Sequence, residues 1–419
     1  MGGGGVQRWL KMSKYLPDYG WIPVVYTPSN TDTANYDDSL NVEVPDDFKV
    51  IRKDIWEPFE WYKRFLGKSK NEKIQPGFLQ ESETNPFLQK LSVWIRGNLF
   101  IPDAKMYWIK PSIHFLTDFV KKEQIDMVIS TGPPHSNHLI AKGIKRKTGI
   151  KWLADFRDPW TNIDYYDKLM LTGWADKKHR KLEKSVFEQA DEVVTVSWSW
   201  AEEFFRITGR MPEVVTNGYD PLDFKGDVKY EQGDILNLTH IGSMNKDRNP
   251  HTLWQAIADL IEKGRIDPLK IRIKFIGPTD VSVFEELKNI NLSDIFEYVG
   301  NLPHKEVIDH IIKSDVLLLP LNDTPNIKGV IPGKLYEYLA SRRPILCIGM
   351  VDGDSAKIIR ESEAGSIFDF KDLQGIQTYL LDSIMKISAG GLESNTNIPE
   401  KYSRQHLAGE MCKILDGIS

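Results

Sequence analysis

The sequence predicts an α/β fold of two Rossmann-like domains, each a doubly wound parallel sheet, with a cleft between them. Short apolar runs of strand length alternate with amphipathic stretches of helix length, which is typical of parallel sheets covered by helices. The alternation stops near residue 220 and then begins again. The chain has 419 residues, about twice the usual length of one domain with a single core.

In the N-terminal half, the predicted strands are apolar runs, and helices with one apolar face separate them. The strands are 24–27, 127–130, 152–155 and 193–196, and the helices are 9–16, 136–148 and 175–190. Residues 60–100 look irregular, like an insertion. A Rossmann unit begins with a central strand before its glycine-rich loop, but residues 2–5 are glycines that follow Met1 directly. We therefore expect the first strand to be missing, by truncation rather than by replacement with another segment.

The C-terminal half repeats the pattern. Its predicted strands are 235–241, 271–276, 296–299, 316–320 and 344–348, and its helices are 250–263, 281–289, 305–313 and 334–341. Turn-forming residues at 217–224 and a polar stretch to residue 234 mark the join. The predicted domains are therefore 1–222 and 223–398.

Composition limits the functional class. Hydrophobic residues make up 41% of the chain and charged residues 27%, as in globular proteins, and the net charge of -5 gives no reason to expect nucleic-acid binding. Cys347 and Cys412 lie in apolar stretches, which predicts buried free thiols. The sequence has no run of about 18 apolar residues and no secretion signal, so we expect a cytoplasmic protein.

Several of the twelve tryptophans lie beside basic residues. One interpretation is core aromatics with solvated lysines, and the other is a peripheral membrane surface for a lipid-linked acceptor. The residues are Trp56, Trp61, Lys63, Arg64, Phe65, Trp94, Arg96, Phe100, Trp108 and Lys110.

One motif places charge at the start of a predicted helix. Pro332 and Gly333 suit a first turn, whose free N–H groups attract phosphate, and Lys334 adds a cation. Glu337 follows one turn later and can accept both hydroxyls of a ribose. The alternative is an ordinary amphipathic helix with a Lys–Glu pair.

A second motif follows the strand 235–241. Gly242 and Ser243 allow close backbone approach, while Lys246 and Arg248 can neutralise a diphosphate. The alternative is a charged surface loop. Because both motifs follow strands of one sheet, they are expected at the edge where open α/β sheets bind ligands.

Three further segments follow strands or begin helices in the N-terminal half. Gly4 and Gly5 would let a helix N-terminus approach a charged ligand, or they belong to a disordered tail. His135 and His138 are three residues apart at a helix start. They suggest a sugar-contacting imidazole, with a zinc pair or a buried histidine beside a capping Ser136 as the alternatives.

Asp155, Arg157 and Asp158 follow the strand 152–155. They form either a structural ion network or a carboxylate and a cation in the cleft. Asp352 and Asp354 resemble a metal-binding Asp-X-Asp pair, but they sit in a polar turn, where such residues serve the backbone, and no bound metal is expected.

These motifs resemble the family 4-like glycosyltransferases of the GT-B fold, which has two Rossmann-like domains. The matching segments are 240–243, 298–304, 314–320, 333–340 and 343–345, with 130–135, 155–160 and 215–220 in the first half. The resemblance implies transfer of a sugar from a UDP-, GDP- or related donor to a glycan or lipid-linked acceptor, with retained configuration and no metal or other cofactor. It also implies that the final helix, within 399–419, crosses back to the N-terminal domain.

The resemblance further assigns roles to residues. Lys246 and Arg248 would bind the diphosphate, with helix amides around Gly333, Lys334 and Leu335, and Glu337 would bind the ribose. Lys334 and Arg248 would stabilise the leaving group, and His135 would lie near the acceptor hydroxyl. Many members have a sugar-binding glutamate eight positions before the ribose glutamate, but this sequence has Gly329 there. Asn326 and Lys328 are the candidate substitutes.

Two other functions fit the same fold. One is a nucleotide-sugar 2-epimerase, which needs no acceptor. The other is a catalytically silent binding subunit.

Overall fold

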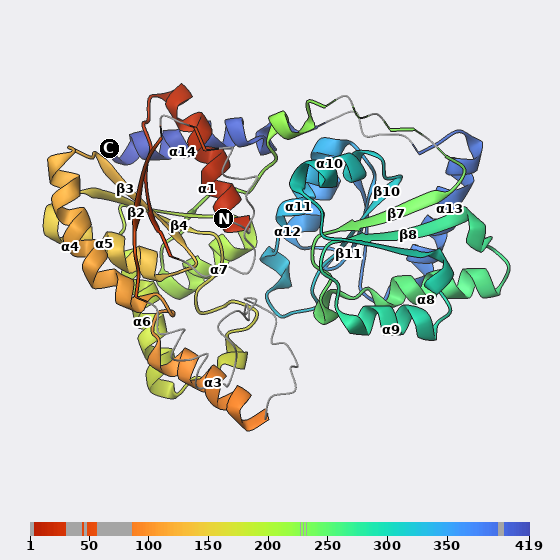
Figure 1. Cartoon of the computed structure of the whole chain (residues 1–419), viewed down its shortest axis with the longest axis horizontal. Coiled ribbons are helices and arrows are strands. Elements are labelled where there is room, and N and C mark those ends of the chain that lie inside the picture. Colours follow the sequence, from red (N-terminus) through yellow and green to blue (C-terminus); the bar gives the residue numbers. More distant parts are fainter. Residues whose placement is uncertain are drawn as a thin grey trace. The chain divides into compact units, whose positions relative to one another are not determined.

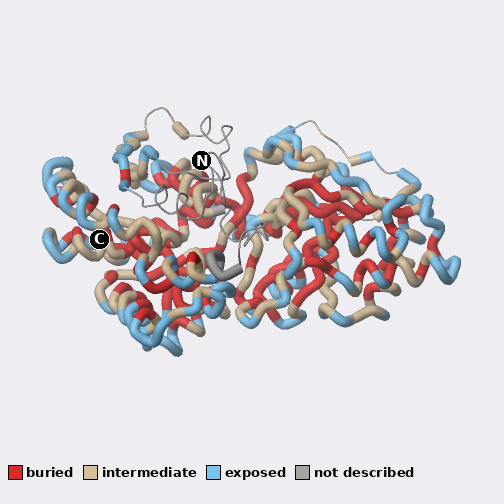
Figure 2. The backbone as a smooth tube through the Cα atoms, turned by 60° about the horizontal axis from the view of Figure 1, so that its bottom comes forward, coloured by how far each residue is buried: buried red, intermediate tan, exposed pale blue. Residues whose placement is uncertain are grey.

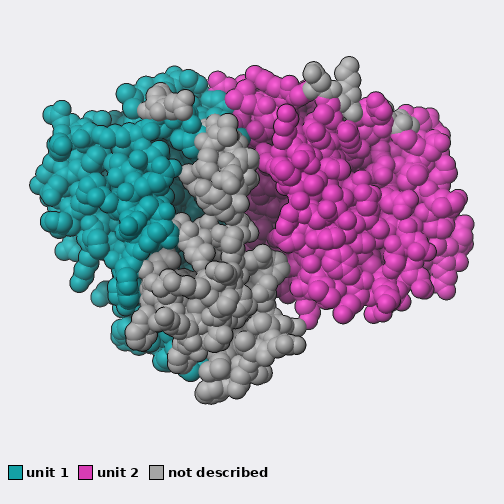
Figure 3. Space-filling model, in the orientation of Figure 1, with its two compact units in different colours: residues 1–216, 407–419 teal, residues 217–406 magenta. Residues whose placement is uncertain are grey.

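The computed structural model describes residues 4–30, 44–45, 48–56, 86–226, 228, 230–231, 233–392 and 398–419. It divides into two compact units, shown in different colours in Figure 3. Unit 1 comprises residues 1–216 and 407–419, and unit 2 comprises 217–406. Each unit has parallel sheets covered by helices, so the predicted α/β fold with two sheet domains is confirmed (Figure 1).

Unit 2 contains one six-stranded parallel sheet in the order β12-β11-β10-β7-β8-β9. The strands are β7 (Leu236–Ile241), β8 (Ile271–Ile276), β9 (Phe296–Gly300), β10 (Val316–Pro320), β11 (Ile345–Ile348) and β12 (Gly365–Phe368). The chain first runs outward from β7 and then returns to start again at β10 beside it. The boundary between β7 and β10 is thus the switch point, where such sheets bind ligands beyond the carboxyl ends.

Helices cover both faces of this sheet (Figure 1). They are α8 (His251–Glu262), α9 (Val281–Asn289), α10 (His304–Ile312), α11 (Gly333–Ser341), α12 (Asp354–Glu361) and α13 (Leu373–Ala389). All residues of β10 are buried, because a central parallel strand is covered on both faces. Figure 2 shows the buried residues in red along the backbone, with exposed residues in pale blue mainly on the outside.

Unit 1 contains two separate parallel sheets, β1–β2 and β3–β4–β5–β6. The strands are β1 (Val24–Pro28), β2 (Lys49–Lys53), β3 (Met127–Gly132), β4 (Lys151–Phe156), β5 (Glu192–Thr195) and β6 (Glu213–Val214). Among the described residues, no strand joins the two sheets or precedes the first helix.

The helices of unit 1 include one in a region predicted to be irregular. They are α1 (Gly4–Tyr15), α3 (Pro86–Leu99), α4 (Met106–Lys122), α5 (Ser136–Thr148), α6 (Gly173–Gln189) and α7 (Trp198–Thr208), with most of α14 (Arg404–Ile418). The irregular prediction for 60–100 is wrong over α3, whose apolar residues suit a helix that packs against residues 169–171. Residues 57–85 lie outside the described part. On α14, Leu407, Met411 and Leu415 pack into the core of unit 1.

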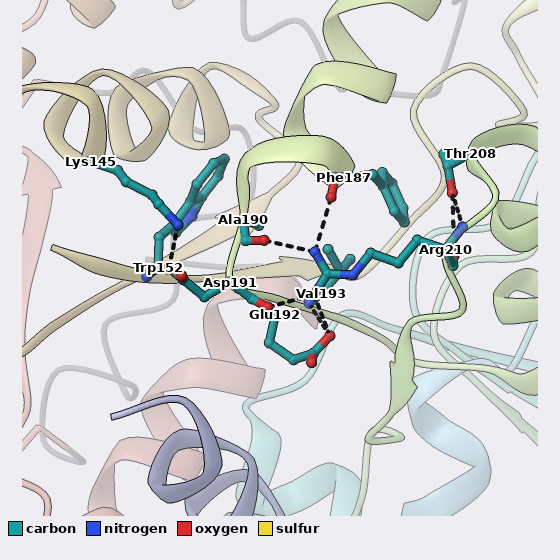
Figure 4. Close-up of polar contacts among 9 residues, drawn as sticks. All are labelled: Lys145, Trp152, Phe187, Ala190, Asp191, Glu192, Val193, Thr208 and Arg210. Atoms are coloured by element: carbon teal, nitrogen blue, oxygen red, sulfur yellow. Dashed lines mark hydrogen bonds and ion pairs between the residues drawn. The ribbon is translucent and has the colours of Figure 1, made fainter. Parts of the chain in front are cut away.

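Arg210 binds the carboxyl end of α6 (Figure 4). Its guanidinium donates to the carbonyl oxygens of Phe187, at 3.0 Å, and Ala190, at 2.7 Å, which closes the carboxyl end of the helix. The neighbouring Asp191 carboxylate accepts hydrogen bonds from Lys145, at 2.5 Å, and from the Trp152 amide, at 2.7 Å. These bonds connect α6, α5 and β4, so α6 is held rigidly on the sheet.

The predicted tryptophan cluster divides between core and surface. Trp108 is buried and donates from its indole nitrogen to Tyr26, at 3.1 Å, as the core interpretation predicts. Trp56 is exposed with its ring edge against Tyr107. Residues 61–65 lie outside the described residues. Both predicted free thiols, Cys347 and Cys412, are confirmed as buried and unpaired.

A buried ion pair connects the first helix to β4. The Arg8 guanidinium donates to both carboxylate oxygens of Asp155, at 3.0 and 3.2 Å, and to the backbone oxygens of Val215 and Thr216. Trp9, at 2.6 Å, and Thr131, at 2.9 Å, donate to the same carboxylate. Burial raises the pKa of Asp155, but Arg8 and these hydrogen bonds outweigh that effect and lower it.

We expect Asp155→Asn to lower the free energy of unfolding by about 3–5 kcal/mol, because the Arg8 charge would remain buried without its partner. Urea unfolding followed by circular dichroism measures the loss. The difference from wild type shrinks as the pH falls through the lowered pKa of Asp155, since the wild-type carboxylate is then protonated too.

The matched control is Glu202→Gln, which removes an exposed i,i+4 ion pair with Arg206 in the same unit. Its expected loss is below about 1 kcal/mol. Equal losses for the two variants would contradict the structural role of Asp155.

Candidate functional site

Two glycines shape the backbone at the switch point of unit 2. Gly242 follows β7 with a φ of 90°, and its amide donates to the Ile276 carbonyl oxygen at 2.7 Å. A side chain on Gly277 would place its Cβ 2.7 Å from the Gly242 oxygen, which the structure cannot accommodate. The two turns therefore approach as closely as they do because both residues are glycine.

His240 supports Lys334 beside this turn. The buried His240 ring donates from Nδ1 to the Leu318 carbonyl oxygen at 3.1 Å, because a carbonyl can only accept. Its Nε2 atom is then free to accept a hydrogen bond from the Lys334 ammonium group, 3.3 Å away. Burial, and then the charge of Lys334, lower the pKa of His240 well below its usual value, so the ring is neutral.

A second cation, Arg248, lies on the same side of the sheet. Its guanidinium donates to the Asn322 side-chain oxygen at 3.0 Å and to the Ser243 carbonyl oxygen at 2.9 Å. Burial, and then the charge of Arg248, lower the pKa of Lys334 well below its usual value, while Glu337 opposes them. The site therefore holds two like charges near one another, which an anion would relieve.

The helix α11 begins at this site and is locked to the sheet. Its N-cap residue is Pro332, which provides no side-chain cap. The Leu335 amide donates to the Pro332 carbonyl oxygen at 3.0 Å, so it is already engaged. The Tyr338 hydroxyl accepts from the Ile241 amide at 3.0 Å and donates toward the Leu318 carbonyl oxygen at 3.4 Å. These bonds fix Gly333 and Lys334 beyond the carboxyl ends of β7 and β10.

Glu337 lies one turn further along α11. Burial raises the pKa of its carboxyl group, with His304 and Arg404 acting to lower it and Asp223 to raise it. His304 lies 3.5 Å from Asp223. Glu337 is half-buried in this polar surrounding, where a hydroxyl-rich group would supply partners for its oxygens.

The remaining predicted donor residues lie at the edges of the site. Lys246 is exposed at the start of the short helix Lys246–Arg248. Gly329 is buried in the short helix Ile327–Gly329. Next to it, Lys328 is exposed, 4.0 Å from Asp352, and the Asn326 side-chain oxygen accepts from Thr324 at 3.1 Å.

In unit 1, two buried histidines lie at the carboxyl end of β3. The Ser130 hydroxyl accepts from the Trp152 indole at 2.8 Å and lies 2.8 Å from His138 Nδ1, to which it donates. The His138 proton is therefore on Nε2. His135 stacks on Trp160 with ring centres 4.6 Å apart. Among the described residues, His138 Nε2 and His135 Nδ1 have no partner, and both face Gly132.

The residue at the N-cap of α5 is not the predicted Ser136, and no third metal ligand joins His135 and His138 in the described part of the chain. His135 itself is the N-cap of α5, whereas Ser136 binds Asp103 through its amide and hydroxyl. Among the described residues, no group of three or more His, Cys, Asp or Glu side chains could hold a metal ion. Burial lowers the pKa of His138 to about 3, so this ring is neutral.

The N-terminus of α1 lies against Arg157. A Cβ on Gly5 would be 1.3 Å from a terminal nitrogen of the Arg157 guanidinium, so a larger residue there would displace the guanidinium. Gly4 begins the helix. Burial raises the pKa of Asp158, with Arg157 opposing it. Asp155 is fully buried by Arg8, so the geometry favours the structural alternative for this residue.

Residues 229–389 match the model of the family described as glycosyl transferases group 1. The matched segment lies within unit 2. A curated relative, a putative colanic acid biosynthesis glycosyltransferase of Salmonella typhimurium strain LT2, is 22% identical over 244 residues. That match covers 56% of this chain and only 59% of the relative's length.

Solved structures share the fold. A sucrose-phosphate synthase from Thermosynechococcus elongatus superposes with a TM-score of 0.60 at 13% identity, covering 99% of this chain and 94% of the other. The Anabaena protein HepE, solved in complex with UDP-glucose, gives a TM-score of 0.51 at 11% identity over 73% of this chain and 82% of its own. The fold is therefore that of the GT-B glycosyltransferases.

Several residues of this site were not singled out from the sequence. His240, Asn322 and Tyr338 act through partners 74 to 97 residues away in the chain. His240 belonged to a recognised motif, but only the register of β7 beside β10 shows that it supports Lys334.

We expect nitrogen-15 NMR to find His240 protonated on Nδ1 and His138 protonated on Nε2, because their neighbours fix each tautomer. Neither ring should titrate between pH 5 and 8, since burial lowers both pKa values. In Ser130→Ala, the His138 signals should lose the single-tautomer pattern while those of His240 stay unchanged. A titrating His138 in the wild-type protein would contradict this network.

Proposed function

We propose that the chain transfers a sugar from a UDP- or GDP-sugar to a glycan or lipid-linked acceptor. The single observation that supports this most is the pair of cations, Lys334 and Arg248, held at the start of α11 beside the Gly242 turn. A helix N-terminus with two cations favours a diphosphate over a neutral ligand. HepE bound to UDP-glucose and the group 1 family match support the same class of donor.

In the proposed reaction, the bond between the sugar and the diphosphate breaks, and negative charge develops on the leaving nucleotide. Lys334, Arg248 and the amides around Gly333 stabilise this charge without a metal ion, and the exposed Lys246 adds a further cation. Glu337 accepts hydrogen bonds from the ribose. The acceptor hydroxyl attacks the anomeric carbon with retention of configuration, and its proton passes to an oxygen of the leaving diphosphate.

The donor sugar has fewer assigned contacts. Gly329 stands where a carboxylate would bind a sugar, and it offers only backbone groups. Asn326 and Lys328, at the same turn, are the candidate side chains. We propose a hexosyl donor.

We expect Lys334→Gln or Arg248→Gln to weaken UDP and GDP binding roughly ten- to a hundredfold, because each variant removes a charged hydrogen-bond donor to phosphate. Isothermal titration calorimetry measures the affinity. The control is Lys288→Gln, an exposed lysine on α9 whose loss should change nothing. Unchanged affinity in both site variants would refute the site.

Transfer itself is tested by NMR with a nucleotide-sugar, with and without extracted glycan acceptors. The proposed reaction consumes donor faster when an acceptor is present and continues in EDTA. Isomerisation of the donor without any acceptor would instead identify an epimerase. Nucleotide binding without any turnover would indicate a silent binding subunit.

We expect nucleotide binding to take up protons at alkaline pH. In the free protein the lowered pKa of Lys334 leaves part of its population neutral, and a bound diphosphate favours the charged form. Affinity should therefore fall as the pH rises. The fall should begin at a lower pH than it would for a lysine with an ordinary pKa. Calorimetry in two buffers with different ionisation enthalpies measures the uptake, which Lys334→Gln should abolish.

A further inference from the structure

One face of α6 is a cationic stripe that ends in an exposed indole. Trp174, Lys177, Lys178 and Lys181 fall within about 100° of the helix circumference and are all exposed. The Lys178 ammonium group lies 4.7 Å from the centre of the Trp174 ring. The opposite face, which includes Val186 and Phe187, is buried against the unit.

Two of the three carboxylates of α6 do not offset this charge, and the third, the exposed Glu188, lies seven residues beyond Lys181, about 10 Å further along the helix. Glu183 points into the core, where it accepts hydrogen bonds from Thr161. Asp176 already binds Arg180 and Tyr166. The three stripe lysines therefore present net positive charge to the solvent.

An apolar edge continues the stripe beyond Trp174. Asn98, on α3, donates to the Met170 carbonyl oxygen at 3.2 Å and accepts from the Thr172 amide at 2.7 Å, which joins the end of α3 to the chain just before α6. Met170 and Leu99 are exposed beside these bonds, Leu99 by 59% and Trp174 by 63%. Indole and apolar side chains next to lysines suit the boundary between lipid headgroups and acyl chains.

The platform that carries these residues is rigid. Arg210 closes the far end of α6, and the Thr172 hydroxyl accepts from the Ala175 amide at its beginning, at 3.3 Å. Figure 1 shows α6 and α3 as neighbours within unit 1. Binding to a surface would therefore order little more than the exposed side chains, which keeps the entropic cost of docking small.

We propose that this surface, formed by Leu99, Met170, Trp174, Lys177, Lys178 and Lys181, docks unit 1 on an anionic lipid bilayer. The lysines bind acidic headgroups, and Trp174 enters the interface. None of the described helices is long and apolar enough to cross a membrane, so docking on the surface is the mode of contact that these residues provide. The inference rests on the proposed function in one respect only, since a lipid-linked acceptor gives the docking its purpose.

The test is co-sedimentation of the purified full chain with vesicles of phosphatidylcholine containing phosphatidylglycerol, and with vesicles of phosphatidylcholine alone. The wild-type protein should sediment with the anionic vesicles only. K177Q/K178Q/K181Q should bind them roughly a hundredfold more weakly, about fivefold for each lysine. Trp174→Ala should weaken binding further at high salt, where the lysine contribution is screened.

The matched control removes three exposed lysines from unit 2 in K288Q/K313Q/K371Q, which has the same net charge as the stripe variant. It should bind like the wild type. Equal losses in both triple variants would overturn the proposal in favour of a bulk charge effect. Unchanged binding by Trp174→Ala at high salt would also overturn it, because the indole would then not enter the interface.

Failure of the docking and failure of the proposed reaction have separate readouts. The stripe variant should keep the wild-type circular dichroism spectrum and its thermal shift with UDP or GDP. A protein that binds vesicles but no nucleotide would refute the proposed function alone. A protein that binds nucleotide but no anionic vesicle would refute the docking surface alone.

Discussion

The arrangement of unit 1 depends on the buried ion pair between Arg8 and Asp155. Both side chains are fully buried, and such a pair is tolerated only where hydrogen bonds satisfy both groups. Here they come from Trp9 and Thr131 on one side and from two backbone carbonyls near residue 215 on the other. The pair thus joins α1, β3 and β4 to the segment that leaves β6.

This pair also determines the charge of its surroundings. Asp155 is neutralised by Arg8, whereas Arg157 stacks against Gly5 at the N-terminus of α1 and donates to the Pro133 carbonyl oxygen. Burial lowers the pKa of Arg157, while the charges of Asp155 and Asp158 act to raise it. One arginine therefore serves the fold, and the second lies as a cation beside the N-terminus of α1, which is also electropositive.

The sequence predicted helices and strands well where the spacing of apolar residues and the turn-forming residues at their ends indicated the same limits. The predicted limits of β8, α9 and β10 are those of the structure, because the two strands are apolar runs and α9 has apolar residues at helical spacing, and Gly, Pro or polar residues flank all three. The strand β2 was missed, since three of its five residues are charged. The two motifs around Gly242 and Lys334 were expected at one sheet edge by topology alone, and the structure places them together.

The contacts that could not be predicted depend on which strands lie side by side and in which register. His240 meets Leu318 only because β7 lies beside β10, and Tyr338 reaches both strands only because α11 crosses their ends. No local pattern states which strands are neighbours. For the same reason the sequence left two alternatives for Asp155, since the choice depended on Arg8, 147 residues away.

A neutral histidine under a lysine has a physical consequence for the unit 2 site. His240 accepts a hydrogen bond from Lys334 without adding charge, so it orients the ammonium group and leaves its electrostatic potential intact. A carboxylate in that place would orient Lys334 equally well but would cancel the charge that attracts an anion. The free site thus keeps Lys334 and Arg248 in mutual repulsion, within a frame fixed by Tyr338 and two glycines. Negative charge relieves that repulsion, so this frame favours an anionic ligand over a neutral one. In the proposed reaction it would favour the state in which the leaving diphosphate carries the most charge.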